Sequence, residues 1–471
     1  MPDDRRPVPT GRLKRTMPLA GFTARAAGGR LVAGLQQRAG RDGAVERFHE
    51  RTAERYAELL GHSRGVLMKM GQIMSMLDSR AVGTGGFWPY QAAMTRLQAD
   101  AHPMHPDLVR ETLDSELGCR TELFAEFGDE PVAAASIGQV HRAVLHDGRH
   151  VAVKIQYPGV ARAIRHDLAN SELLATFLRF VTSASGIRVD VQAVAREAAA
   201  RISEEVDYRH EARTVARFAE LYRGHPFIRI PDVVDDLSGD RVLTMTYLDG
   251  MDWAAAQQAE QELKNAWAEA ITRFSQGNFR HANLMHADPH PGNYRFSEDG
   301  TVGFVDFGCV KVLPELQRRR LVAMNRAVFE GRKDDYRDLM TQAGFLSDDS
   351  DLTADDLYRW QSDMLYEVVG APQPVTYTPE TTARTIRGLF DVRDGTHPMA
   401  RMTVPDDFVF LSRLQLAVLS VCAGLNATMY SRSLFDDIDA VADPVSELGR
   451  QHHAWVRERG LPMALDHHDH P

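Results

Sequence analysis

The chain has 471 residues, of which 44% are hydrophobic and 25% are charged, a composition typical of a globular protein with room for two lobes. Its formal net charge is −10, although residues 1–45 hold nine Lys or Arg against three Asp, so the rest of the chain is strongly acidic. An acidic body argues against general nucleic-acid binding. The widely spaced cysteines form no C-x-x-C pair, which disfavours a disulfide framework or zinc site and fits a reducing compartment.

Two segments bear on location. The most hydrophobic stretch, residues 408–425, contains Arg413 and Gln415, so we expect a buried helix rather than a membrane span. The N-terminus lacks the charged start and apolar run of a secretory signal. The Arg-rich residues 11–41 fit either a solvated tail or a peripheral contact with anionic lipid. We therefore expect a cytoplasmic protein without a transmembrane segment, peripheral to a membrane at most.

The residue pattern predicts five segments. Residues 1–43 form a flexible basic segment, and residues 44–120 form a helical extension. Residues 121–248 are rich in predicted strands and include one long helix, whereas residues 249–448 are mainly helical. Residues 449–471 form a polar tail. The boundary between two lobes is expected near residues 248–250.

The strand-rich segment begins with a predicted hairpin. Residues 140–145 and 149–157 have strand character, and the Asp-Gly between them is a strong hairpin signal. We expect helices over residues 160–184 and 191–222. Further short strands are expected near residues 227–234, 240–247, 292–296 and 302–305.

A lysine within an apolar strand is the first candidate for chemistry. In VAVKIQYPG, Lys154 alternates with Val153 and Ile155 and so lies on the opposite face of the strand. Such a lysine is often a surface residue, but on a small antiparallel sheet it can reach nucleotide phosphates if a carboxylate holds it. The segment EEVDYRHEA supplies Glu204, Glu205, Asp207 and Glu211. Alone these acids indicate a solvated helix face; beside Lys154 they suggest the Lys–Glu pair of kinases.

The octet HADPHPGN, which ends at Asn293, has three interpretations: a metal-binding box, a structural turn or a catalytic loop. Pro289 and Pro291 exclude a regular helix, so the two histidines lose the shared face of a helical metal pair. Asp288 lies five residues before Asn293 and eighteen before Asp306 of the D-F-G triplet. The order strand Lys, helix Glu, Asp, Asn and D-F-G is that of protein kinases, and five ordered features are more specific than any one.

Two kinase features are missing. Residues 133–138 read AAASIG where a kinase has G-x-G-x-x-G, and no A-P-E follows the D-F-G. Alanines lack the freedom of glycine to adopt positive φ, so this nucleotide loop should be stiffer. The missing A-P-E argues against an activation segment and a peptide-docking surface.

Six motifs together resemble the UbiB/AarF-type atypical kinases, called ADCK proteins in animals: KMGQIMS, AAASIGQVH, VAVKIQYPGV, EVDYRHEA, HADPHPGN and DFG. The resemblance runs from about residue 60 to residue 430. It implies an α+β, bilobal protein-kinase-like fold with an added N-terminal helical extension packed over the active site. It also implies binding of ATP or ADP with Mg²⁺.

The resemblance assigns roles by motif. Lys154 would pair with Glu211 and touch the nucleotide phosphates, and Asp288 would be the catalytic base. The metal ligands would be Asn293 and Asp306. The residues around the nucleotide would also include Ala133, Ala134, Ala135, Ser136, Met245 and Tyr247. The regulatory K-x-G-Q and E-x-D motifs would be formed by Lys69, Gly71, Gln72, Glu205 and Asp207, with Lys69 pairing to Glu205.

The function that the resemblance implies is ATP hydrolysis or phosphoryl transfer in support of quinone or other isoprenoid-lipid metabolism. Two alternatives stay open: a nucleotide-gated scaffold that binds lipid or protein partners, and a small-molecule phosphotransferase of the aminoglycoside-kinase type. The latter shares the H-x-D-x-x-x-x-N loop and the later Asp, but the K-x-G-Q helix would crowd its acceptor site.

Overall fold

The computed structural model describes residues 103–135, 137–168, 203, 206–286, 288–390, 397–403, 405–463 and 465. Its contacts divide the chain into two compact units. The first comprises Met1–Arg213 with Val233–Tyr247, and the second comprises Thr214–Asp232 with Leu248–Pro471. The division passes through one helix, α10 (Tyr208–Leu221).

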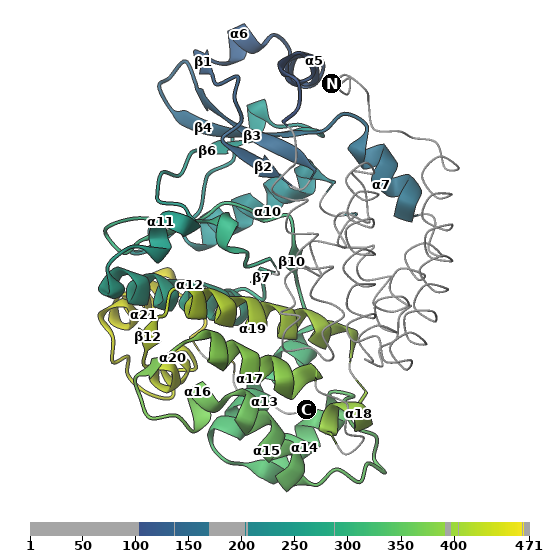
Figure 1. Cartoon of the computed structure of the whole chain (residues 1–471), viewed down its shortest axis with the longest axis vertical. Coiled ribbons are helices and arrows are strands. Elements are labelled where there is room, and N and C mark those ends of the chain that lie inside the picture. Colours follow the sequence, from purple (N-terminus) through teal and green to yellow (C-terminus); the bar gives the residue numbers. More distant parts are fainter. Residues whose placement is uncertain are drawn as a thin grey trace, which may run out of the picture. The chain divides into compact units, whose positions relative to one another are not determined.

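The first unit contains an antiparallel sheet and short helices (Figure 1). The strands run in the order β1–β3–β4–β6, and β2 also pairs with β3. The strands are β1 (Glu126–Phe127), β2 (Ala133–Ala135), β3 (Gly138–Val144), β4 (His150–Gln156) and β6 (Val242–Thr246). The helices are α5 (Pro106–Leu117), α6 (Arg120–Leu123), α7 (Val160–Leu168), the start of α10 and the 3₁₀ turn η1 (Asp235–Leu237).

The β3–β4 hairpin confirms the expected Asp-Gly turn. The backbone N–H of Leu145 donates to the carbonyl of Arg149 at 2.9 Å, and Gly148 has a φ of +86°, which favours glycine. In β4 the apolar side chains on one face, including Val153, are fully buried, and Lys154 on the other face is also buried. This strand is therefore enclosed on both sides, so its lysine is not a surface residue.

The expected single helix over residues 191–222 is wrong. Helix α10 begins only at Tyr208, because Val206 and Asp207 are not helical. The side chain of Asp207 accepts a hydrogen bond from the N–H of His210 at 2.9 Å, as an N-cap residue does. Aspartate competes with helical hydrogen bonding through its own carboxylate, which explains why a helix begins here rather than continues.

The second unit is mainly helical and carries three small sheets. Its helices are α11 (Trp253–Gln257), α12 (Gln261–His281), α13 (Glu315–Phe329), α14 (Lys333–Gln342), α15 (Ala354–Met364), α16 (Tyr366–Val369), α17 (Pro379–Phe390), α18 (Pro398–Arg401), α19 (Asp406–Gly424), α20 (Ser431–Ile438) and α21 (Glu447–Arg459). The strands form the sheets β5–β9–β8 (Ile228–Arg229, Val302–Phe304, Tyr294–Phe296), β7–β10 (Met285–His286, Val310–Lys311) and β11–β12 (Val375–Thr376, Thr428–Met429).

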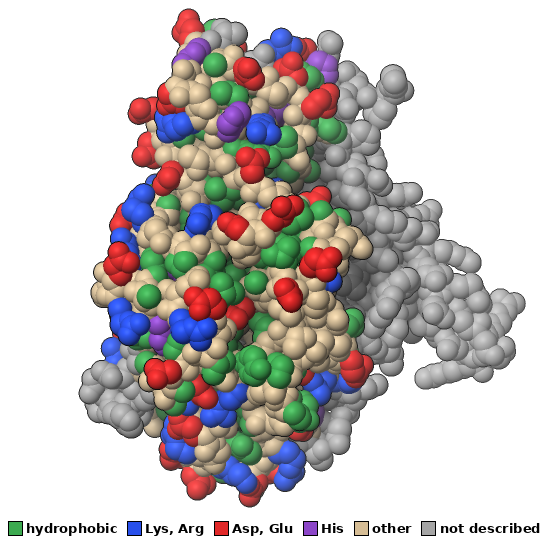
Figure 2. All heavy atoms as spheres, turned by 90° about the vertical axis from the view of Figure 1, so that its left-hand side faces the viewer, with side chains coloured by type: hydrophobic (Ala, Val, Ile, Leu, Met, Phe, Trp, Pro, Cys, Tyr) green, Lys and Arg blue, Asp and Glu red, His purple; other side chains and the backbone are tan. Residues whose placement is uncertain are grey.

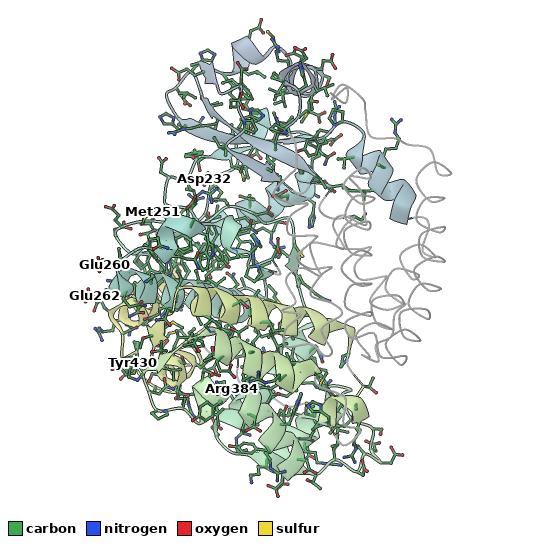
Figure 3. The ribbon with its side chains drawn as sticks, viewed as in Figure 1. Asp232, Met251, Glu260, Glu262, Arg384 and Tyr430 are labelled. Carbon is green, nitrogen blue, oxygen red and sulfur yellow. The ribbon has the colours of Figure 1, made fainter. Side chains whose placement is uncertain are left out.

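Helix α12 is the central helix of the second unit. It packs beside α19, α20 and α21 (Figure 1), and most of its residues after Trp267 are buried. At its exposed start, Glu260 and Glu262 lie at the edge of the unit (Figure 3), where carboxylates interact favourably with the helix dipole. The neighbouring α19 contains residues 408–424 of the stretch expected to form a buried helix, and its Val421 and Cys422 are buried.

No helix within the described ranges is long and apolar enough to cross a membrane. On the face of the molecule in Figure 2, acidic and basic side chains of the described residues are interspersed with apolar ones.

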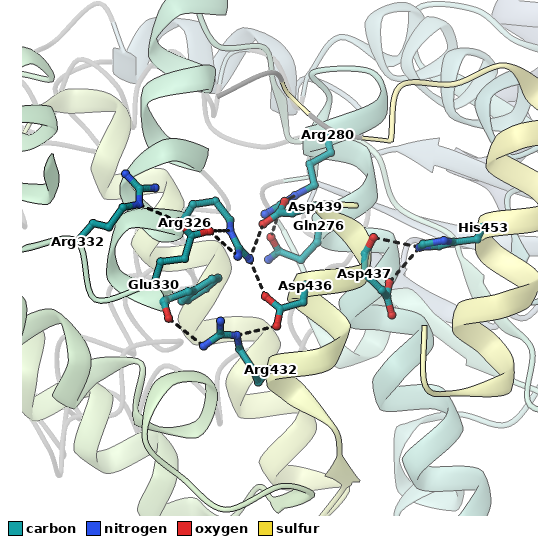
Figure 4. Close-up of polar contacts among 11 residues, drawn as sticks. Gln276, Arg280, Arg326, Glu330, Arg332, Arg432, Asp436, Asp437, Asp439 and His453 are labelled. Carbon is teal, nitrogen blue, oxygen red and sulfur yellow. Dashed lines mark hydrogen bonds and ion pairs between the residues drawn. The ribbon is translucent and has the colours of Figure 1, made fainter. Parts of the chain in front are cut away.

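A buried ionic cluster ties α12 and α13 to the end of α20 (Figure 4). Its members are Arg273, Arg280, Arg326, Asp436, Asp437 and Asp439. Arg273 donates to both oxygens of Asp437 at 2.7 Å, the bidentate geometry in which guanidinium and carboxylate interact best. Burial alone would raise the pKa of Asp437, but hydrogen bonds from Arg273 and His453 lower this pKa below its ordinary value. The cluster fixes which faces of these helices meet, because an unpaired charge here would be costly.

Candidate active site

A buried ion pair joins the predicted lysine to the predicted glutamate. The Nζ of Lys154 on β4 donates to the two carboxylate oxygens of Glu211 on α10 at 2.7 and 2.9 Å. Lys154 is 7% exposed and Glu211 is 1% exposed. The ammonium also lies 5.3 Å from the ring centroid of Tyr208, in the range of a cation–π contact. The pair therefore holds a positive charge at a fixed place beside the sheet.

The alanines expected in a nucleotide loop form a strand instead, which corrects that expectation. Ala133 pairs with Val140 and Ala135 pairs with Gly138, so only residues 136 and 137 lie between β2 and β3. Ser136 falls outside the described residues. A Cβ on Gly138 would lie 2.2 Å from the carbonyl oxygen of Ile155, so only glycine allows this approach of β3 to β4. The glycine of AAASIG is thus needed for strand pairing.

The other two residues expected around the nucleotide, Met245 and Tyr247, lie at the end of β6. Met245 pairs with Ala152 and is buried. The N–H of Tyr247 donates to the carbonyl of His150 at 2.9 Å, and its ring centroid lies 4.6 Å from the guanidinium carbon of Arg142. The sheet therefore fixes both backbones, while their contact with a nucleotide stays a prediction.

In the second unit, the structure brings Asp288 and Asn293 together. The side-chain amide of Asn293 donates to the carbonyl of Asp288 at 3.1 Å and to its carboxylate at 3.4 Å. Residues Pro291–Asn293 form a 3₁₀ turn, and the Nδ1 of His290 caps it by accepting from the N–H of Gly292 at 3.0 Å. The prolines thus shape a tight loop that presents Asp288 and Asn293 on one side.

His286 makes a contact that the three interpretations of the octet do not predict. Its Nε2 lies 2.5 Å from the carbonyl oxygen of Asp306. A carbonyl can only accept, so Nε2 carries the proton and donates. The ring also packs edge-on against Phe307, at 5.2 Å between centroids. His286 therefore links the loop that carries Asp288 to the D-F-G triplet, and the H-x-D spacing was the signal for it.

The D-F-G triplet is held in place around Asp306. Its Oδ1 accepts from the N–H of Gly308 at 3.0 Å, and Phe307 is fully buried, 4.8 Å from the ring of Phe218 on α10. The chemistry of this donor set suits Mg²⁺, which takes one or two carboxylate ligands and fills its shell with water and phosphate oxygens. The amide nitrogen of Asn293 donates to Asp288, which leaves the amide oxygen as its ligand atom. In the described part of the chain, no group of three or more His, Cys, Asp or Glu could hold a metal by itself.

Several predicted regulatory residues lie outside the described residues: Lys69, Gly71, Gln72 and Glu205. Asp207, the second acid of E-x-D, is described and caps α10, four residues before Glu211. Its position ties the E-x-D motif to the helix that carries the partner of Lys154.

An antiparallel sheet with a buried Lys–Glu pair, together with a helical unit that holds the Asp, Asn and D-F-G residues, defines an α+β protein-kinase-like fold. Residues 96–340, just over half of the chain, match the family model described as the ABC1 atypical kinase-like domain. The chain belongs to this ABC1/UbiB family, which confirms the resemblance seen in the six motifs.

Named relatives agree with this assignment. The chain is 29% identical to the atypical kinase COQ8B, mitochondrial, of Rattus norvegicus, over 88% of this chain and 74% of that protein. It is 28% identical to COQ8B of Danio rerio, over 83% of this chain but only 61% of that protein. A solved structure of Rv3197 with erythromycin, from Mycobacterium tuberculosis, matches with a TM-score of 0.58 and 29% identity, covering 84% of this chain and 98% of that one.

Proposed function

We propose that this protein is an ATP-binding atypical kinase or ATPase that works with Mg²⁺. The observation that carries the proposal is the buried pair of Lys154 and Glu211, whose strand and helix positions match the pair that kinases need for activity. A buried lysine whose ammonium donates to both oxygens of a carboxylate is held in a fixed direction, as a contact with nucleotide phosphates requires.

The remaining roles follow the motifs. Lys154 binds nucleotide phosphates, and Asp288 takes the proton of the attacking group. Asn293 and Asp306 would hold Mg²⁺, which would neutralise the developing charge. The residues proposed to surround the nucleotide are Ala133, Ala134, Ala135, Ser136, Met245 and Tyr247. We assign residues 121–248 as the N-lobe and residues 249–448 as the C-lobe.

The biological setting that we propose is quinone or other isoprenoid-lipid metabolism. In this proposal, residues 44–120 cover the active site with the K-x-G-Q motif, and Lys69 pairs with Glu205 of E-x-D. A covering helix would keep protein substrates out and favour a small or lipid acceptor. Lipid and quinone profiles of a deletion strain, complemented by wild type or by Asp306→Asn, test this setting. Equal rescue by both would contradict it.

Two substitutions test the chemistry. Asp288→Asn should lower the turnover of ATP hydrolysis by about 10²–10⁴ because the general base is lost, while Mg-ADP still raises the melting temperature. Asp306→Asn should abolish that Mg-dependent rise. Glu298→Gln, an exposed carboxylate between β8 and β9, is the matched control and should change neither. Unchanged ATP hydrolysis in Asp288→Asn would contradict the role of Asp288 as the general base. Nucleotide-dependent partner binding that survives in this variant would favour the scaffold function.

A second candidate is a phosphotransferase for small hydroxyl compounds. It is favoured by one comparison, the Rv3197 structure, which contains erythromycin. Erythromycin and simple hydroxyl compounds, each incubated with the protein and γ-labelled ATP, provide the test. Label on the compound that depends on Asp288 would support this function, and label released only as phosphate would count against it.

A further inference from the structure

Three buried histidines from distant parts of the second unit form a continuous hydrogen-bonded chain, here called the histidine chain. His225 lies in the turn between α10 and β5, His452 lies on α21, and His281 is the last residue of α12. The Nε2 of His225 is 3.0 Å from the Nδ1 of His452, and the Nε2 of His452 is 3.2 Å from the Nε2 of His281. All three side chains are buried.

Backbone groups at both ends of the histidine chain determine which ring nitrogens carry a proton. The Nδ1 of His225 accepts from the N–H groups of Phe227 and Ile228, at 3.3 and 3.1 Å, so His225 carries its proton on Nε2 and donates to His452. At the other end, the Nδ1 of His281 lies 2.5 Å from the carbonyl of Pro462 and must donate to it. The Nε2 of His281 is then an acceptor, and His452 donates to it.

Each ring of the histidine chain is therefore neutral. A second proton on any ring would place a donor against a donor, because each unprotonated nitrogen already accepts a hydrogen bond. The surroundings oppose protonation as well: Arg273 and Arg280 of α12, Arg229 of β5 and His453 of α21 lie close by. The nearby carboxylate of Asp437 is bound by Arg273 and His453. Burial lowers the pKa of His452 well below its ordinary value, and the neighbouring His281, His225 and Arg273 lower it further.

The two ends of the histidine chain lie at the segments that lead to the proposed catalytic residues. His225 holds the N–H groups at the start of β5, and the carbonyl of Phe227 accepts from Val302 of β9, the strand that leads to Asp306. His281 ends the helix that leads to β7 and Asp288. His452 lies between these ends, beside Trp455, which packs against His225 at 4.5 Å between ring centroids.

We propose that His452 of the C-terminal helix is a positioning residue, which acts through the histidine chain to hold the segments carrying Asp288 and Asp306 in one arrangement. The inference rests on the proposed function and extends it, because α21 lies outside the residues matched by the family model. A helix beyond the matched domain thereby becomes part of what sets the geometry of phosphoryl transfer.

Two variants separate positioning from simple packing. His452→Phe fills the space without hydrogen bonds, whereas His452→Gln can accept from His225 through its oxygen and donate to His281 through its nitrogen. Glu458→Gln, an exposed position on the same helix, is the control. The full-length proteins are compared for kcat and KM of ATP hydrolysis and for hydrogen–deuterium exchange, with residues 333–342 of α14 as the internal reference.

His452→Phe should lower kcat about tenfold or more with little change in KM, since small misplacements of catalytic groups reduce turnover strongly. Exchange should rise in peptides over residues 282–293 and 300–308 but not in the reference, and His452→Gln should restore both readouts. Equal exchange of these peptides in His452→Phe and wild type would overturn the inference. Hydrogen–deuterium exchange needs no nucleotide, so this result does not depend on ATPase activity. A wild-type protein without ATPase activity would instead refute the proposed function.

Ring ¹⁵N spectra of the wild type give a test that does not depend on a variant folding. At pH 7 the three rings should be neutral, two protonated on Nε2 and one on Nδ1. Assignment uses His225→Gln and His281→Gln, each of which should remove one of these signals. A doubly protonated ring among the three, or a different tautomer pattern, would overturn the histidine chain.

Discussion

At the residue scale, the decisive feature is that Lys154 and Glu211 are buried as a pair. Two charges removed from water lose hydration, and their attraction and hydrogen bonds offset this loss only while both are present. The residues alone leave several acids of EEVDYRHEA as candidate partners, and the family resemblance implies Glu211. The structure shows that Glu211 rather than Asp207 meets the lysine, because Asp207 turns back to cap α10.

Removal of one member of the pair should therefore destabilise the fold. Glu211→Ala should lower the free energy of unfolding by about 3–5 kcal/mol, since it removes the carboxylate that accepts two hydrogen bonds from a buried ammonium. The double variant Lys154→Met with Glu211→Leu should recover much of this loss. Urea denaturation measures both, with Glu220→Ala, an exposed acid on the same helix, as a control that should change little. A Glu211→Ala variant as stable as the control would show that the pair is not buried in solution.

At the element scale, the β2–β3–β4 hairpins decide where the proposed nucleotide-binding residues lie. The alternation of apolar residues and the Asp-Gly turn predicted β3 and β4 well, because these signals are local. The sequence does not predict the pairing of Ala133–Ala135 with β3, because AAASIG stands at the place of a kinase loop motif and its three alanines carry no alternation of apolar and polar residues. Likewise, helical propensity alone does not predict that Asp207 interrupts the expected helix and caps the start of α10.

Gly138→Ala should disturb this element. Its Cβ would meet the carbonyl oxygen of Ile155 at 2.2 Å, so β3 and β4 would have to separate, at about 1–3 kcal/mol. Gly148→Ala is the comparison: it lies at positive φ but in open space, and should cost about 1 kcal/mol. Thermal unfolding and nucleotide affinity report the difference. If Gly138→Ala is no worse than Gly148→Ala, the close strand approach is not required.

At the scale of the whole molecule, buried histidines make stability depend on pH. Burial is the main reason that the pKa of His281 falls from 6.5 to about 4 and that of His225 to about 2. The folded state therefore binds fewer protons than the unfolded state below pH 6.5. Stability is fully present above that pH and is lost as the pH falls towards 4.

Unfolding free energy measured by urea denaturation should fall between pH 6.5 and pH 4, by up to about 1.4 kcal/mol per pH unit for each histidine that stays neutral in the folded state. His452→Gln should flatten this dependence, because it removes one titrating ring without breaking the chain. The pKa of Asp437 is lowered, so Asp437 changes the unfolding free energy only at more acidic pH, outside this range. A pH-independent unfolding free energy across this range would contradict buried neutral histidines.

The sequence by itself determined the family, the order of the motifs and the β3–β4 hairpin, because each depends on short-range spacing or turn chemistry that no distant residue alters. The tertiary structure shows that Glu211, the partner implied by the family resemblance, meets Lys154. Only the tertiary structure decided that His286 bonds the backbone of Asp306 and that His225, His281 and His452 form one chain. These contacts join residues far apart in the sequence. A buried polar group loses its hydrogen bonds to water and needs a partner in the protein. The packing of the fold determines which partner lies within reach.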